Sequence, residues 1–184
     1  ITPPDQNVLD ESSPIDCNAA YLPSVLEVEG VEDVMPVIYR AGIVKHGDNI
    51  HGVLFKGVSN GPESVSGAVV PDSVSLPVSI PSRLSEITSL KPGDRMLAYF
   101  VGEKVKMRRF NVVAVHDVMV EADDNLIVMA ELSDMQRLSG WDETQVSAME
   151  VVLGRDYKDE ASIMDINMEI GVLANAYSSD SESP

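Results

Sequence analysis

The stretch from Ile80 to Trp141 constrains the fold of this chain more than any other part of the sequence. Arg83 to Leu90 carries apolar residues at every third position, which predicts a short helix. A Pro-Gly-Asp turn follows it. Met96–Phe100 and Val105–Val115 are apolar, strand-length runs separated by four residues, which predicts a β-hairpin fed by that helix.

The second half of this stretch predicts a strand followed by a helix. Glu121–Asn125 is a polar turn, and Leu126–Met129 is a short apolar run. Ser133 and Gln136 have the spacing of a capping box, so we expect Ser133 to be the N-cap of this helix. Gly140 can end that helix in the left-handed conformation.

The flanking segments add strands on both sides and one longer helix. Val34–Val44 is extended but interrupted by a proline, and Ile50–Val58 pairs back against it. Val69–Val78 contains two prolines and predicts an irregular edge segment. Val146–Leu153 is apolar on both faces, as in a buried strand. A helix that begins near Asp159 follows, with isoleucines at spacings of three and four.

We therefore expect an α+β fold of two lobes. Ser59–Ser66 has the composition of a linker. One lobe would be discontinuous, with a sheet and helices, and would join residues 1–61 to residues 146–184. The other would be an inserted β-rich lobe over residues 62–145.

The order and spacing of these segments resemble the extracytoplasmic domain of FtsX/MacB-type permeases of ABC transporters, a family that includes the lipoprotein-releasing permeases LolC and LolE. The resemblance covers nearly all of Ile1 to Tyr177. The segments that carry it are Gly30–Pro36, Gly52–Val58, Ile80–Leu84, Leu90–Asp94, Arg109–Val113, Leu132–Leu138 and Val146–Leu153.

This resemblance implies a non-catalytic domain without cofactors, part of an inner-membrane protein and lying on the periplasmic side. ATP hydrolysis would occur on a separate cytoplasmic subunit or domain, and the domain would relay that motion to a substrate outside the membrane. The implied partners are the parent membrane spans, an ATPase subunit, a second permease subunit and a periplasmic protein or lipoprotein client. Residue 1 is Ile, so we expect the 184 residues to be part of a longer protein.

Composition excludes some functions. The net charge of −17 opposes binding to nucleic acid, which needs clustered Lys and Arg, and also disfavours an anionic membrane surface. No apolar run reaches the ~18 residues of a membrane span. Cys17 is the one cysteine of the chain and permits no internal disulfide, so its role stays open.

Few residues have the pattern of a chemical site. His46 and His51 flank a turn but supply only half of a zinc ligand set. The carboxylates of Glu121–Asn125 lack the spacing of a calcium loop. We therefore expect no metal. His116 beside Asp117 could orient a general base, which keeps a hydrolase as one alternative. A stand-alone extracytoplasmic ligand-binding module, with an apolar pocket between the lobes, is another.

The hairpin turn and its basic strand form the candidate surface for a partner, with a solvated strand face as the alternative reading. The candidate contact residues are Phe100, Val101, Glu103, Lys104, Lys106 and Arg108. LolC-type domains carry a long projecting loop here that grips a lipoprotein carrier, whereas this chain has only four residues. We therefore expect no capture of a LolA-type carrier through this hairpin, and a LolE-like or MacB/FtsX-like role instead.

Overall fold

The computed structural model describes residues 13–62, 76–102, 104–117 and 126–180. The predicted turn at Glu121–Asn125 and most of the linker and edge segments around residues 63–75 lie outside them. The elements are β1 (Ile15–Asp16), α1 (Leu22–Val25), β2 (Val31–His46), β3 (Asn49–Val58), β4 (Leu76–Pro81), α2 (Ser82–Thr88), β5 (Arg95–Phe100), β6 (Lys106–His116), β7 (Ile127–Glu131), α3 (Leu132–Ser139), β8 (Gln145–Val146), β9 (Ala148–Leu153), a 3-10 turn (Arg155–Tyr157) and α4 (Glu160–Asp180).

Six of these strands close into a barrel. The order β3-β7-β4-β6-β5-β2 is closed by antiparallel pairing of β2 with β3, from Ile38 opposite Gly57 to His46 opposite Asn49. The β3–β7 and β4–β6 pairs are parallel, and the other pairs are antiparallel. Closure gives the terminal strands of the barrel, β2 and β3, a partner in each other and so shortens the free strand edges.

Three phenylalanines fill the barrel. Phe55 lies 4.9 Å from Phe100 and 5.1 Å from Phe110 between ring centroids, and all three rings are almost completely buried. These separations are those of favourable aromatic pairs. Helix α3 packs so closely over β3 that a Cβ on Gly57 would lie 2.7 Å from Cγ of Met135. Position 57 therefore requires glycine.

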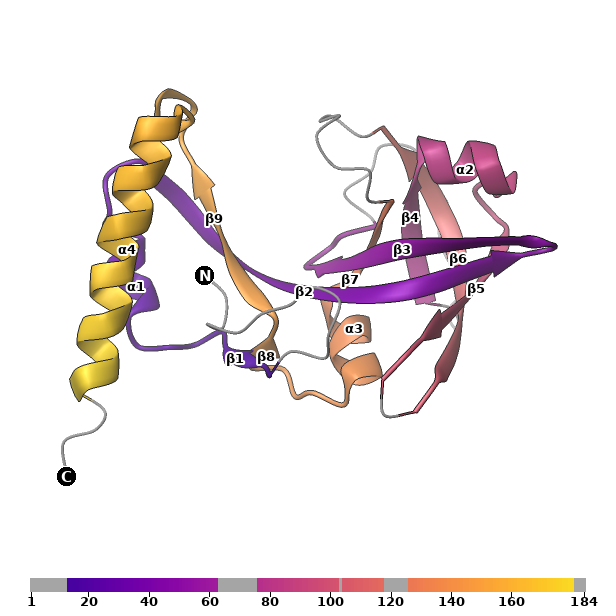
Figure 1. Cartoon of the computed structure of the whole chain (residues 1–184), viewed down its shortest axis with the longest axis horizontal. Helices are drawn as coiled ribbons and strands as arrows, with labels where there is room; N and C mark the ends of the chain where they lie inside the picture. Colours follow the sequence, from indigo (N-terminus) through magenta and orange to yellow (C-terminus); the bar gives the residue numbers. More distant parts are fainter. Residues whose placement is uncertain (1–12, 63–75, 103, 118–125, 181–184) are drawn as a thin grey trace.

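Strand β2 runs out of the barrel into a second, smaller lobe (Figure 1). Its first half, Val31–Val37, pairs with β9. Helices α1 and α4 cover this two-stranded ribbon, and the buried contacts come from Val25 of α1, from Val28 just after it, and from Ile166 and Ile170 of α4. The small lobe thus has a core of its own, separate from the larger cluster inside the barrel.

The fold is α+β with two lobes, as the sequence predicted. The strand pairing does not coincide with the division expected at residues 61 and 62. Residues 38–46 of β2, and all of β3, lie in the same barrel as β4 to β7. The residue ranges assigned to the two lobes stay a prediction.

Two local predictions were wrong. Strand β4 is central rather than an edge, since it lies between β7 and β6. It tolerates Pro77 because β7 pairs with it only at Val78 and Ser79, so the proline removes no hydrogen bond on that side. Helix α3 begins at Leu132 with Glu131 as its N-cap, and no side chain caps it. The expected end of this helix is confirmed, since Gly140 has φ +72°.

The barrel core predicts that substitutions at two positions of β6, three residues apart, change stability by very different amounts. Phe110→Ala should lower the free energy of unfolding by about 3–5 kcal/mol, because it empties the centre of the aromatic cluster. Met107→Ala, on the outward face with 51% of its surface exposed, should change it by less than about 0.5 kcal/mol. Urea denaturation of both variants measures the difference. Equal losses would contradict this inward and outward assignment.

Candidate partner-binding surface

The β5–β6 hairpin is formed as predicted, with Arg95 opposite Asn111 and Phe100 opposite Lys106. Val101 and Lys104 lie in the turn and are exposed. Glu103 lies outside the described residues. The side chain of Arg108 is also exposed, and its Nη1 donates to the carbonyl oxygen of Met107.

Two of the expected contact residues, Phe100 and Lys106, make contacts within the protein instead. Phe100 is only 1% exposed and packs on Phe55 inside the barrel, so it cannot offer surface to a partner. Lys106 Nζ donates to the carbonyl oxygen of Leu138, 3.1 Å away, and so ties the hairpin to the last turn of α3. A cation suits this place, because carbonyl groups concentrate partial negative charge at a helix C-terminus.

The two candidate histidines do not belong to a metal site within the described residues. Within the described residues, no group of three or more His, Cys, Asp and Glu side chains could hold an ion. His46 and His51 stand near the β2–β3 turn but are not cross-strand partners. Glu121, Asp123, Asp124 and Asn125 lie outside the described residues.

His116 does have a close hydroxyl neighbour. Its Nδ1 lies 2.6 Å from Oγ of Ser79 on β4, and the ring also hydrogen-bonds to the backbone of Ile127 on β7. Burial lowers the pKa of His116 below its ordinary 6.5, although the Ile127 bond and the charge of Asp117 oppose that shift. Ser79 is 0% exposed, so no substrate carbonyl reaches its hydroxyl. The pair therefore links three strands rather than forming a nucleophile and base.

Cys17 is half-buried beside the residues that precede β8, where its Sγ lies 3.9 Å from the carbonyl oxygen of Glu143. Burial, and then the charge of Asp16, raise the pKa of this thiol. A raised pKa leaves little thiolate at neutral pH, so Cys17 is a weak nucleophile.

A polar cluster at the junction of the two lobes was missed by the sequence analysis. The hydroxyl of Tyr39 donates to Oε1 of Glu150, and Lys56 Nζ lies 2.8 Å from Oε2 of the same carboxylate. The Lys56 ammonium also lies 5.7 Å from the centre of the Tyr39 ring. Burial, followed by the Glu150 hydrogen bond, raises the pKa of Tyr39 strongly. Glu150 of β9 is thereby held between β2 and β3 of the barrel.

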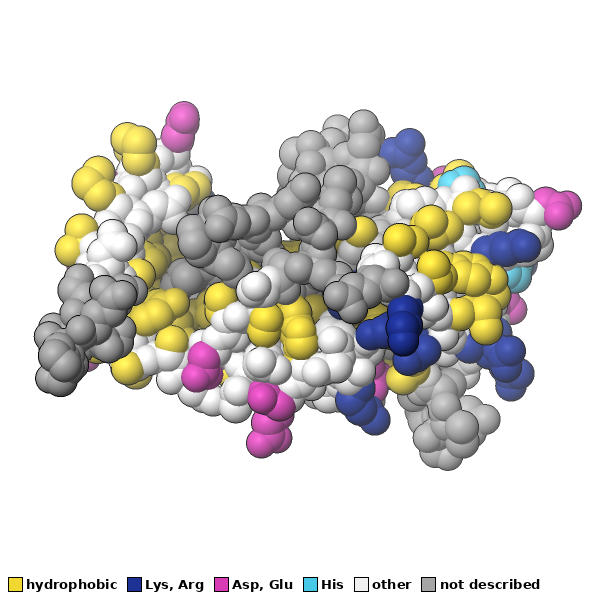
Figure 2. All heavy atoms as spheres, turned by 60° about the horizontal axis from the view of Figure 1, so that its bottom comes forward, with side chains coloured by type: hydrophobic (Ala, Val, Ile, Leu, Met, Phe, Trp, Pro, Cys, Tyr) yellow, Lys and Arg dark blue, Asp and Glu magenta, His cyan; other side chains and the backbone are white. Residues whose placement is uncertain are grey.

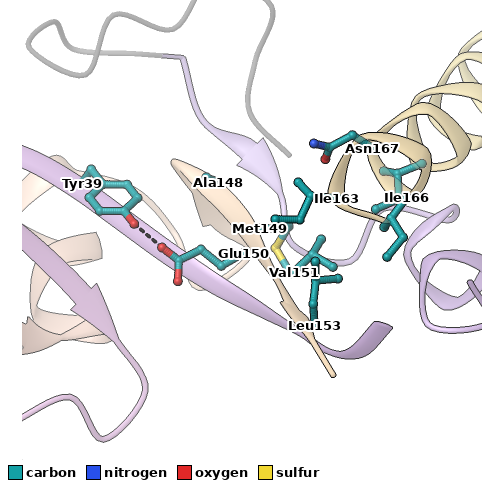
Figure 3. A pocket seen from close by; sticks show the side chains of 10 residues that line it. Tyr39, Ala148, Met149, Glu150, Val151, Leu153, Ile163, Ile166 and Asn167 are labelled. Atoms are coloured by element: carbon teal, nitrogen blue, oxygen red, sulfur yellow. Dashed lines mark hydrogen bonds between the residues drawn. The ribbon is translucent and has the colours of Figure 1, made fainter. Parts of the chain in front are cut away.

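The same junction borders an apolar groove of about 390 Å³. Figure 3 shows Glu150 pointing from β9 toward Tyr39, while Met149 and Val151 point to the other side, toward Ile163 of α4. Apart from Tyr39, Glu150 and Asn167, every side chain that lines the groove is apolar. A lone glutamate in an otherwise apolar strand was the one sequence signal of this cluster.

The comparisons identify proteins with the same arrangement of elements. No family model matches this sequence, and no curated protein matches it. The periplasmic region of MacB from Actinobacillus actinomycetemcomitans matches with a TM-score of 0.50 and 13% identity, over 89% of this chain and 76% of that chain. The extracellular domain of the noncanonic ABC-type transporter YknZ from Gram-positive bacteria matches with a TM-score of 0.47 and 12% identity, over 83% and 78%. The chain thus has the fold of the periplasmic region of MacB.

None of the helices in the described ranges is long and apolar enough to cross a membrane.

The junction cluster predicts measurable coupling between β3 and β9. In a double-mutant cycle, Lys56→Met and Glu150→Gln should show a coupling energy of about 0.5–1 kcal/mol, because both side chains are mostly covered, with 22% and 31% exposed. The Arg137–Asp134 pair on α3, where Arg137 is 75% exposed, is the control and should couple by at most about 0.3–0.5 kcal/mol. A Lys56–Glu150 coupling no larger than this control would contradict the junction's role.

His116 predicts a pH dependence of stability. Its pKa is lowered by folding, so the unfolded chain takes up this proton at a higher pH than the folded chain does. The contribution to stability is complete above about pH 6.5 and is lost as the pH falls from there through the folded-state pKa. His116→Gln should flatten the fall in the free energy of unfolding over that range. A fall that stays as steep in this variant as in the native chain would exclude His116 as its source.

Proposed function

We propose that this chain is a non-catalytic extracytoplasmic domain of an ABC transporter permease, which couples cytoplasmic ATP hydrolysis to movement or release of a substrate outside the membrane. The observation that carries the proposal is the two-lobe arrangement on one continuous strand. MacB's periplasmic region shares this fold. The partners would be the parent membrane spans, an ATPase subunit and a second permease subunit, and the protein would lie in the inner membrane.

The structure offers a physical route for such coupling. Helices α1 and α4 pack together in the small lobe, so spans attached to a longer chain would pull on that lobe. β2 passes from there into the barrel without a break, and Tyr39, Lys56 and Glu150 bridge the two lobes beside it. Motion at α4 would therefore move the barrel with it instead of being absorbed in a flexible joint.

The client of this domain would not be a LolA-type carrier gripped by the β5–β6 hairpin. The turn spans four residues between Phe100 and Val105, and even fully extended residues reach only ~3.5 Å each. Burial of Phe100 withdraws the aromatic residue next to the turn from a partner's reach. A lipoprotein client would have to be recognised elsewhere, as in a LolE-like or MacB-like role.

The apolar groove beside Glu150 favours a second candidate, a small-ligand binding module. Its volume falls in the range of small-molecule sites, and its lining is largely apolar. It lies between β9 and α4, inside the small lobe, with Tyr39 at its edge. A ligand there would wedge α4 away from the ribbon, so this alternative predicts that apolar ligands change the position of α4.

Accessibility and coupling test the proposed function in cells that express the protein containing this chain. With Cys17→Ser as background, Met107→Cys should react with a membrane-impermeant maleimide in intact cells, whereas buried Met96→Cys should not. Glu150→Gln with Lys56→Met should leave ATP hydrolysis intact and reduce transport-linked output several-fold, because the bridge between the lobes is lost. Labelling of Met107→Cys only after lysis would overturn the extracytoplasmic assignment.

A further inference from the structure

Charge is strongly segregated in this molecule. The chain has 30 Asp and Glu against 13 Lys and Arg. Yet residues 38–46 of β2 and the whole of β3, β5 and β6 contain no Asp or Glu. They contain Arg40, Lys45, Lys56, Arg95, Lys106, Arg108 and Arg109. Arg40 is buried, and Lys106 and Arg108 share the face of the buried Phe100 and Ala98. The outward face of these strands therefore has the basic residues Lys45, Lys56, Arg95 and Arg109 and no Asp or Glu.

The outward face of these strands is also apolar at its centre. Cross-strand pairing places Ile43 beside Tyr99, and Tyr99 beside Met107. The next row places Ile50, Lys45, Leu97 and Arg109 side by side. Ile43, Ile50 and Met107 are 38%, 62% and 51% exposed. We call these seven residues the basic wall, and Figure 2 shows apolar side chains among Lys and Arg side chains at this end of the molecule.

A second apolar surface lies on α4 and has the opposite charge. Met164, Met168 and Val172 follow one another at intervals of four, so they form one stripe along the helix, and each is 63–64% exposed. Asp165 and Glu169 border this stripe, three residues before Met168 and Val172. Helix α4 contains no Lys or Arg. We call these five residues the acidic stripe.

We propose that the basic wall of one copy binds the acidic stripe of a second copy. Both surfaces have an exposed apolar centre with charges at its border, and the charges are opposite in sign. The wall consists of outward side chains of paired strands, so a partner binds it through side chains. An exposed helix with protruding methionines can do so, because methionine adapts to an irregular surface.

The two surfaces lie at opposite ends of the molecule, so the contact is heterologous and leaves one wall and one stripe free in each pair (Figure 1). The net charge of −17 opposes association at long range, but at physiological salt it is screened beyond about 8 Å. The paired patches are smaller than a stable interface of ~800 Å² per partner, so the dissociation constant should be on the order of 0.1–1 mM. Such a contact becomes populated when copies are held close together.

Charge reversal tests the proposal by sedimentation equilibrium of the 184-residue chain at up to millimolar concentration. The native chain should associate beyond a dimer. Lys45→Glu with Arg109→Glu should abolish this association, and so should Asp165→Lys with Glu169→Lys. The four substitutions in one chain keep the net charge at −17 and should restore it, because the two surfaces exchange their signs. Failure of the fourfold variant to associate would overturn the contact, provided that its unfolding curve shows it folded.

Matched variants separate this contact from changes in net charge alone. Glu27→Lys with Glu86→Lys changes the charge as the α4 reversal does, on exposed residues of other surfaces, and should leave association in place. Met164→Ser with Met168→Ser removes the apolar centre of the stripe. We expect this stripe variant, mixed with the Lys45→Glu, Arg109→Glu variant, to form only a 1:1 complex. The first chain has an intact wall and the second an intact stripe, so no further copy can bind.

Other occupants of these surfaces give other results. Stripe-to-stripe pairing of two α4 helices would survive the wall reversal, and that result would overturn the proposal. Flotation with vesicles of phosphatidylglycerol and phosphatidylcholine tests a lipid surface. Vesicle binding that the wall reversal abolishes, with no self-association of the native chain at any concentration, would assign the wall to the membrane instead.

Discussion

The register of strand β2 is the constraint on which both lobes depend. Along residues 38–46 it pairs with β3 on one side and, at residues 43–45, with β5 on the other, and it closes the barrel. Along Val31–Val37 it pairs with β9 and supports the small lobe. A shift by one residue would turn Ile38 and Val44 outward and would expel side chains from both cores at once. The register is therefore specified by Ile38 and Val44 in the barrel core and by the partly buried Val31 and Val34, which pack against the core of the small lobe.

This double role explains how one strand can be long without becoming an aggregation site. A 16-residue strand with a free edge would invite pairing with another chain. Here the barrel half has partners on both sides where β3 and β5 flank it, and Pro36 interrupts the row of donors in the half that pairs only with β9. Tyr39 stands where these halves meet, and its backbone N–H donates to Oγ of Ser147. The polar junction thus lies where the strand changes partners.

Local patterns predicted the parts of this fold that local forces determine. The helix–hairpin unit over α2, β5 and β6, the glycine end of α3 and the long C-terminal helix all follow from periodicity and turn residues. Barrel closure does not, because the parallel pairs β3–β7 and β4–β6 join segments more than 30 residues apart. Ser133 shows the same limit: its capping pattern is good, but the N-cap of α3 is Glu131, two residues earlier.

The candidate site was harder to predict because apolar residues occupy both faces of the hairpin strands. Phe100 and Met107 look alike in a hydrophobicity pattern, yet the first lies inside the barrel and the second outside it. Which face each side chain occupies is decided by its cross-strand neighbour. Phe100 pairs with Lys106, so both point inward, and the long Lys106 side chain reaches the end of α3 from that face.

The net charge of a protein does not describe the charge of a single binding surface. A value of −17 suggests a molecule that repels acidic partners everywhere, but a partner within a Debye length responds to the charges nearest to it. On the barrel those are Lys45 and Arg109, and on α4 they are Asp165 and Glu169. Strand pairing brings the first group together from two separate strands, β2 and β6, whereas helical periodicity creates the second within one helix. Only the second can be recognised before the fold is known.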